Sequence, residues 1–206
     1  RCRPGDVVRA HVARPVEDAT NPGLCHPERV EYRGGGPHAS PAEGAAIPMP
    51  KDARPDWDTY FMTIARHVAQ RSNCCRRQVG AVIVREKTLV STGYNGTPFG
   101  VKNCFEGGCA RCNSDAPPGQ SYDTCICVHA EENAIALAAR HGTVTDGGTL
   151  YSTLRPCFGC AKEMVQAGIR EAVFETDMGY PPALEVVYKD LIAQSGLGLR
   201  QFCVPD

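Results

Sequence analysis

The stretch "CVHAEENA", residues 127–134, places a histidine and a glutamate two positions apart at the beginning of a helical pattern. Ala, Ile and Leu follow at helical intervals, which predicts a helix from about His129 to His141. A His and a Glu at a helix start, taken alone, usually serve in capping and surface charge. A second motif is therefore needed before His129 and Glu131 indicate chemistry.

The stretch "RPCFGCAKEMV", residues 155–165, supplies that second motif. Cys157 and Cys160 lie three positions apart at another predicted helix start, so both sulfurs fall on one face, where the first-turn N–H groups favour thiolates. If the two helix starts converge at the edge of a sheet, His129, Cys157 and Cys160 provide three of the four tetrahedral ligands of zinc. An open fourth position is typical of catalytic rather than structural zinc.

Glu131 is too close in sequence to His129 to be a natural fourth ligand, and we expect it to act as general acid and base beside the zinc-bound water. Ala130 fits as the small residue that lets a substrate ring approach. C-x-x-C alone is common in structural zinc and redox sites, but here it follows His129 by 28 residues and a predicted strand. The combination of H-x-E with P-C-x-x-C is the signature of zinc nucleobase deaminases.

The chain beyond residue 54 predicts alternating helices and strands. The stretch "DWDTYFMTIARHVAQRS", residues 56–72, predicts an amphipathic helix with Asp56 or Asp58 as N-cap. Two β-branched runs, at 78–86 and 87–95, predict an antiparallel strand pair. The remaining predicted elements are strands at 147–154, 170–175 and 197–204 and helices at 157–168 and 182–196. This order indicates one three-layer α/β/α domain with a five-stranded mixed sheet.

Residues 1–54 carry repeated Pro and few periodic apolar positions, so we expect a disordered or linker extension. Five metal-ligating side chains of this extension have no compact ligand spacing and are expected to be scattered: Cys2, His11, Cys25, His26 and His38. Residues 55–206 form the expected zinc domain, with a Gly-, Pro- and Cys-rich insertion at about 97–128.

Composition limits the partners and the compartment. A net charge of −1 and a pI near 6.6 give no overall attraction for nucleic acid or anionic membranes, so no polynucleotide or membrane partner is expected. Apolar stretches such as residues 79–84 are far too short to cross a bilayer, and no signal-peptide layout is present, so we expect a cytoplasmic protein, with the nucleus as the alternative. Twelve cysteines, mostly clustered in an α/β pattern, favour metal over disulfides.

Five blocks of this sequence resemble, in the same order, those of the deoxycytidylate (dCMP) deaminase family: "WDTYFM", "RQVGAVIV", "STGYNGTP", "CVHAEENA" and "PCFGCAKEMVQAGI". The resemblance covers about residues 55–203 and implies a cytidine deaminase-like fold. It further implies zinc-dependent hydrolysis of dCMP to dUMP and ammonia, which supplies dUMP for thymidylate synthesis. A homo-oligomer, commonly a hexamer, with dCTP as activator and dTTP as inhibitor is implied as well.

The resemblance also suggests substrate contacts. Asn95 of "GYNG" should bond the sugar or base, although Asn-Gly is equally a strong turn signal. Arg71 and Ser72 are the first candidates for the phosphate, because a monophosphate needs a localised cation and hydrogen-bond donors. Arg76 or Arg77 is the second choice, with a solvated turn as the alternative interpretation.

Family members build a second, structural zinc site from a Cys at the end of the first helix and others in the insertion. On matching positions this implies a four-thiolate site of Cys74, Cys104, Cys109 and Cys125, with Cys112 or Cys127 as substitutes. The alternative is a set of reduced buried thiols. We therefore expect one catalytic and one structural zinc ion.

Two alternatives to dCMP deamination stay open. One keeps the zinc chemistry but acts on another cytosine or adenine substrate, in single-stranded DNA or tRNA; the other is a non-catalytic, zinc-scaffolded regulatory subunit. Deaminases of adenosine in tRNA usually have a shorter connection than the 32 residues from Thr97 to Val128. Glu131 argues against a scaffold, because a scaffold needs the three ligands but not the proton carrier.

Overall fold

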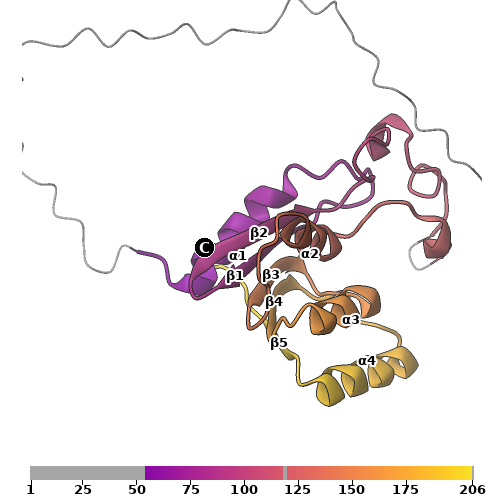
Figure 1. The fold of residues 1–206 in the computed structure, drawn as a ribbon. Helices are drawn as coiled ribbons and strands as arrows, with labels where there is room; N and C mark the ends of the chain where they lie inside the picture. Colours follow the sequence, from indigo (N-terminus) through magenta and orange to yellow (C-terminus); the bar gives the residue numbers. More distant parts are fainter. Residues whose placement is uncertain (1–53, 118–119, 206) are drawn as a thin grey trace, which may run out of the picture. The chain divides into compact units, whose positions relative to one another are not determined.

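Five strands form one mixed sheet in the computed structural model, which describes residues 54–117 and 120–205. The strand order is β2-β1-β3-β4-β5 (Figure 1). Strand β1 is antiparallel to both β2 and β3, whereas β3, β4 and β5 run parallel. The strands are β1 (Gly80–Arg85), β2 (Thr88–Tyr94), β3 (Thr149–Leu154), β4 (Glu171–Thr176) and β5 (Gly198–Gln201). The expected five-stranded mixed sheet is confirmed.

Four α-helices accompany the sheet in the predicted order: α1 (Trp57–Ala69), α2 (Ala130–Arg140), α3 (Phe158–Gln166) and α4 (Pro182–Ser195). Of the two candidate N-caps for α1, the structure uses Asp56, whose Oδ1 accepts a hydrogen bond from Thr59 N at 2.8 Å. Asp58 instead accepts from Tyr151 and Arg200 and ties α1 to the sheet. None of the described helices is long and apolar enough to span a membrane.

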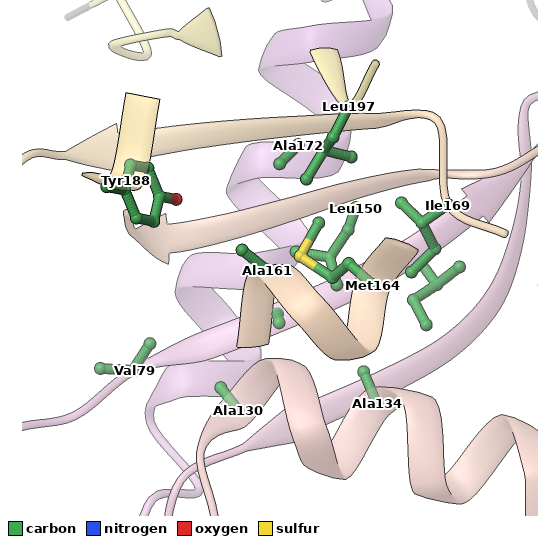
Figure 2. Packing of buried hydrophobic residues seen from close by; sticks show 12 residues of the cluster. Val79, Ala130, Ala134, Leu150, Ala161, Met164, Ile169, Ala172, Tyr188 and Leu197 are labelled. Carbon is green, nitrogen blue, oxygen red and sulfur yellow. The ribbon is translucent and has the colours of Figure 1, made fainter. Parts of the chain in front are cut away.

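Each face of the sheet buries its own apolar cluster. Helix α1 covers one face, where its Phe61, Met62 and Ala65 pack against strand residues including Val82 and Val173. Helices α2, α3 and α4 cover the other face; Figure 2 shows Ala130 and Ala134 of α2, Ala161 and Met164 of α3, Tyr188 of α4 and Leu150 of β3 in this second cluster. Because helices cover both faces, the expected three-layer α/β/α architecture is confirmed.

Two glycines let helices approach the sheet closely. A Cβ on Gly93 of β2 would lie 2.1 Å from Ala130 O and 2.4 Å from Ala134 N, both backbone atoms of α2. A Cβ on Gly80 of β1 would lie 2.2 Å from Ala65 O of α1 on the opposite face. Any larger side chain at either position must push a helix outward, so glycine sets both helix-to-sheet distances.

Two expectations concern residues 1–54: that they form a disordered or linker extension, and that its Cys and His residues are scattered. These residues, apart from Arg54, lie outside the described part of the chain. The insertion lies between β2 and α2 and contains two short 3-10 helices, Cys104–Glu106 and Tyr122–Thr124. An isolated antiparallel bridge between Gly96 and Val128 closes the insertion at its base. The insertion therefore returns the chain to the sheet directly before α2.

We expect Gly93→Ala to lower the free energy of unfolding by about 1–3 kcal/mol or more, because the added methyl group overlaps the backbone of α2. Gly142→Ala is the matched control at the other end of α2. A Cβ on Gly142 would meet no atom within 4 Å. The loss of stability in this variant therefore comes only from placing alanine in the left-handed backbone conformation of Gly142, at φ +65°. Urea unfolding of both variants measures the difference; equal losses would contradict the close-approach argument.

Candidate metal centre and active site

The structure brings His129, Cys157 and Cys160 together as predicted. The Nδ1 atom of His129 lies 3.4 Å from Cys157 Sγ and 3.3 Å from Cys160 Sγ, and the two sulfurs lie 3.5 Å apart. Tetrahedral zinc with bonds of about 2.0–2.3 Å places its ligand atoms about 3.5–3.8 Å apart. The three donor atoms therefore fit one zinc ion, and no fourth His, Cys, Asp or Glu joins this group among the described residues.

Two helix starts supply these ligands. His129 is the N-cap of α2, and Cys157 is the N-cap of α3, with Cys160 in the first turn of α3. Strand β3 leads directly into α3, so the carboxyl end of β3 and the start of α3 meet at the site. This is the edge of an α/β sheet at which ligands generally bind.

Two tyrosines hold the turn that carries Cys157. Tyr188 is fully buried, and its hydroxyl donates to Pro156 O at 2.8 Å. The hydroxyl of Tyr180 accepts from Phe158 N at 3.1 Å, which satisfies a backbone donor in the first turn of α3. These bonds fix the position of the Cys157 thiol relative to the end of β3.

Glu131 lies beside the three ligands and is shielded from solvent. Its side chain is 4% exposed, its Oε1 accepts from Ser152 Oγ at 2.8 Å, and its Oε2 lies 3.5 Å from Cys160 Sγ. Burial raises the pKa of the Glu131 carboxyl above its usual value, and the Ser152 hydrogen bond opposes this shift. A carboxyl group with a raised pKa in this position suits repeated gain and loss of a proton near neutral pH.

The charges of the ligand side chains favour a cation between them. The Cys160 thiol next to Cys157, together with the His129 imidazole, lowers the pKa of Cys157 to about 4. The Cys157 thiolate in turn raises the pKa of His129 to about 9. The same negative field that favours an imidazolium favours a bound metal cation.

Glu132 caps α2 rather than lying on its surface without a partner. Its Oε2 accepts from the backbone N–H of His129 at 2.8 Å, which forms a capping box around the first turn. This bond orients the residue that carries the imidazole. Glu131 and Glu132, neighbours in sequence, therefore have separate roles, one facing the ligands and one holding the helix start.

The predicted substrate residues Asn95 and Ser72 are bonded to each other inside the protein. Asn95 Oδ1 accepts from Ser72 Oγ at 2.7 Å and from Val79 N at 2.8 Å, and Asn95 Nδ2 donates to Arg77 O at 2.9 Å. One Nδ2 hydrogen of Asn95 is left for a ligand by this network. The substrate roles of Asn95 and Ser72 stay predictions, and Asn95 also holds the connection between α1 and β1.

The remaining predicted substrate residues differ in exposure. Arg71 is exposed, as a residue that meets a phosphate from solution requires. Arg76, a second-choice candidate, donates to the carbonyl oxygens of Cys112 and Ser114 and so holds the insertion. Ala130 is fully buried against the sheet and in van der Waals range of the Gly93 backbone. Their contacts with a substrate stay predictions.

The cysteines of the insertion come together, but in a different grouping from the predicted one. The predicted set Cys74, Cys104, Cys109 and Cys125 is split between two groups of four. One group contains Cys74 and Cys104, the other contains Cys109 and Cys125, and both contain Cys112 and Cys127. Sequence spacing could not separate these arrangements, because the grouping depends on how the insertion folds back towards α2.

Sequence reasoning missed Ser152 and Tyr188. Ser152 is fully buried and bonds Glu131, but in "GGTLYSTL" it is one of several small polar residues of a strand. Only the pairing of β3 with β1 shows which of these residues faces α2. Tyr188 was one apolar position in a helical pattern, and its bond to Pro156 depends on the packing of α4 near α3.

The residues of this site lie within a region that matches a known protein family. The family model of the cytidine and deoxycytidylate deaminase zinc-binding region matches residues 55–176. Deoxycytidylate deaminase of Schizosaccharomyces pombe is 44% identical over 157 residues, which are 76% of this chain and 47% of that protein. Deoxycytidylate deaminase of Saccharomyces cerevisiae is 45% identical over 149 residues, 72% of this chain and 46% of that protein. The chain thus spans about half the length of these curated relatives.

A solved structure shares the fold over most of its own length. The crystal structure of dCMP deaminase from the cyanophage S-TIM5, in complex with dCMP and dUMP, has a TM-score of 0.58 and 29% identity. The match covers 72% of this chain and 98% of that chain. The deaminase fold expected from the sequence is therefore confirmed.

We expect Cys157→Ser to remove one zinc ion per chain, because His129 and Cys160 alone leave two of the three ligands. Glu131→Gln should keep that ion, since the carboxyl group is not one of the grouped ligands. Metal content by mass spectrometry measures both, with Cys203→Ser as a control for loss of an exposed thiol. Full zinc content in Cys157→Ser would contradict the assignment.

Proposed function

The chain belongs to the family of cytidine and deoxycytidylate deaminases, and on this premise we propose that it hydrolyses dCMP to dUMP and ammonia, supplying dUMP for thymidylate synthesis. The observation that carries the proposal is the buried Glu131 carboxyl group beside the His129, Cys157 and Cys160 donor atoms. A site for metal alone would not need a carboxyl group held by Ser152 next to the ligands. The combination is what hydrolytic deamination requires.

Three relatives support dCMP as the substrate. The yeast proteins at 44% and 45% identity are deoxycytidylate deaminases, and the cyanophage enzyme at 29% identity binds dCMP and dUMP. The net charge of −1 also favours a mononucleotide over a polynucleotide, which needs many neutralised phosphates. dCMP combines the expected base chemistry with a single phosphate.

The chemistry divides between a metal and the residues of this chain. Zinc held by His129, Cys157 and Cys160 would supply the Lewis acidity that makes water nucleophilic near neutral pH. Glu131 accepts a proton from the water that attacks C4 of cytosine and delivers a proton to the ring nitrogen N3. It then takes the second proton from the new C4 hydroxyl group and gives it to the exocyclic amine, so that the C4–N bond breaks, the C4 carbonyl forms, and ammonia leaves with dUMP as the other product.

Ser152 positions Glu131 for these transfers. Its hydroxyl holds Oε1 at 2.8 Å, while Oε2 lies on the ligand side, 3.5 Å from Cys160 Sγ, where we place the reacting water. Because the surroundings are buried, the carboxylate exchanges its proton with the substrate rather than with bulk water. The Ser152 hydrogen bond also keeps the pKa of Glu131 from rising further.

The finer features of the family form part of the proposal. Arg71, Ser72, Asn95 and Ala130 are the residues assigned to the substrate, and the resemblance of the sequence blocks supports this. A hexamer activated by dCTP and inhibited by dTTP is supported by the same resemblance. The cysteine-rich insertion supports metal beyond the catalytic zinc.

We expect zinc-replete protein to form dUMP from dCMP, and Glu131→Gln to reduce kcat by about 100-fold or more, because the proton carrier is lost. Glu132→Gln is the matched control, since glutamine keeps the capping bond to His129 N. The assay follows dUMP and ammonia, with and without dCTP, beside cytidine, single-stranded DNA and tRNA. Preferred turnover of a polynucleotide, or none of any substrate, would contradict the proposed function.

Ser152→Ala should lower kcat by about tenfold and move the acid limb of the kcat/KM profile to higher pH. The direction follows because Ser152 stabilises the carboxylate; without it the pKa of Glu131 rises, and protonation disables the base at higher pH. Ser91→Ala is the matched control, because Ser91 Oγ also bonds α2, at Ala134 O, without touching Glu131. An unmoved acid limb in Ser152→Ala would contradict the positioning role.

A further inference from the structure

Six cysteine sulfurs outside the catalytic trio form two groups of four that share two members. The first group is Cys74, Cys104, Cys112 and Cys127, and the second is Cys109, Cys112, Cys125 and Cys127. Within each group, all sulfurs lie within 4.8 Å of one another. Two sets of four points that share two points correspond to two tetrahedra with a common edge.

The measured separations match that geometry. Cys112 Sγ lies 3.9 Å from Cys127 Sγ, the shared edge, and 3.6 Å from Cys125 Sγ. Cys109 Sγ lies 3.9 Å from Cys125 Sγ. A zinc ion with four Zn–S bonds of about 2.3 Å requires sulfur separations of about 3.8 Å. The second group therefore has room for one ion, and the 4.8 Å limit on all separations is compatible with one ion in the first group as well.

Backbone N–H groups face the sulfurs in both groups. The N–H groups of Arg76 and Arg77 point at Cys74 Sγ, which belongs only to the first group. The N–H groups of Cys112 and Ile126 point at Cys109 Sγ, which belongs only to the second group. Each group therefore has its own backbone donors at a cysteine that the other group lacks, as is usual for the surroundings of metal ligands.

We propose that these six cysteines bind two zinc ions in one cluster, with Cys112 and Cys127 as bridging ligands. Cys74 and Cys104 complete one ion, and Cys109 and Cys125 complete the other. This goes beyond the single structural zinc implied by the family resemblance and is independent of which substrate the enzyme deaminates. It is also the arrangement in which all six thiolates are ligands at once.

Charge favours the second ion. Two zinc ions with six thiolates carry the same net charge as one zinc ion with four, so the second ion brings two more thiolates into coordination without added negative charge. With a single ion, two thiols would remain beside the thiolates of the filled site at about van der Waals distance. Cys104, Cys109 and Cys112 are buried, where uncompensated thiolate charge is costly.

The donor set and its spacing select zinc. All-thiolate tetrahedral sites hold zinc or iron–sulfur clusters. In an iron–sulfur cluster each cysteine binds at the outside of a cage that also contains inorganic sulfide, whereas here the sulfurs converge on single points within 4.8 Å. The six cysteines are free thiols at distances well beyond a disulfide bond of about 2.05 Å.

The cluster would join three segments that are far apart in sequence. Cys74 follows α1, Cys104 to Cys112 lie in the insertion, and Cys125 and Cys127 come directly before α2. Cys127, a bridging ligand, is two residues from His129, and the Gly96–Val128 bridge lies between them in sequence. The cluster therefore fixes the segment that delivers His129 to the catalytic site.

Zinc content of the full chain tests the proposal directly. All proteins carry Cys2→Ser and Cys25→Ser, so that only described cysteines contribute thiolates. In this background we expect three zinc ions per chain, and two in His129→Ala, which removes the catalytic ion. X-ray absorption of the His129→Ala protein should then show sulfur-only coordination and scattering between two neighbouring zinc ions.

One ion in His129→Ala, or two ions without zinc–zinc scattering, would overturn the proposal. If His129→Ala does not fold, a count of two rather than three in the parent protein overturns it equally. Cys112→Ser should lose at least one ion and abolish zinc–zinc scattering, because it removes a bridge. Cys75→Ser is the matched control: Cys75 Sγ lies 3.7 Å from Cys104 Sγ but belongs to neither group, so both cluster ions should remain. None of these results depends on deaminase turnover.

Discussion

The close approach of α2 to the sheet at Gly93 is the constraint on which the site depends. A Cβ at this position would lie 2.1 Å from Ala130 O, so glycine alone lets the first turn of α2 rest on β2. That turn carries Glu131 and follows His129, and its position places both beside the start of α3. The distances of 3.3 and 3.4 Å from His129 to the two sulfurs follow from this packing, whereas the C-x-x-C spacing sets the 3.5 Å between the sulfurs.

The site gives opposite electrostatic environments to neighbouring side chains. Neighbouring hydrogen-bond donors lower the pKa of Cys157 and favour its thiolate, and this thiolate raises the pKa of His129, so the field at the imidazole favours a cation. Glu131, two residues from His129, is buried and has a raised pKa, so its surroundings favour proton exchange. Metal binding and proton transfer can therefore operate within one helical turn. The sheet shields Glu131 from solvent, whereas the helix starts present His129 and Cys157 to a metal ion.

The sequence predicted those features that depend on local spacing. Hydrophobic periodicity was sufficient for the order of helices and strands, and H-x-E with C-x-x-C was sufficient to predict that His129, Cys157 and Cys160 lie together beside Glu131. Ser152 was missed because only strand pairing shows which side chain of β3 faces α2. The grouping of the insertion cysteines was not predictable because six similar thiols allow many sets of four, and only the folded loop selects among them.

We expect the starts of α2 and α3 to hold one zinc ion with an open position beside Glu131. Diffraction from crystals of the zinc-bound protein at the zinc absorption edge tests it most directly. We expect an anomalous peak about 2.0–2.3 Å from His129 Nδ1 and from both Cys157 Sγ and Cys160 Sγ, with no fourth protein ligand and with its open side towards Glu131. A fourth protein side chain on the ion, or no peak between these three residues, would contradict it.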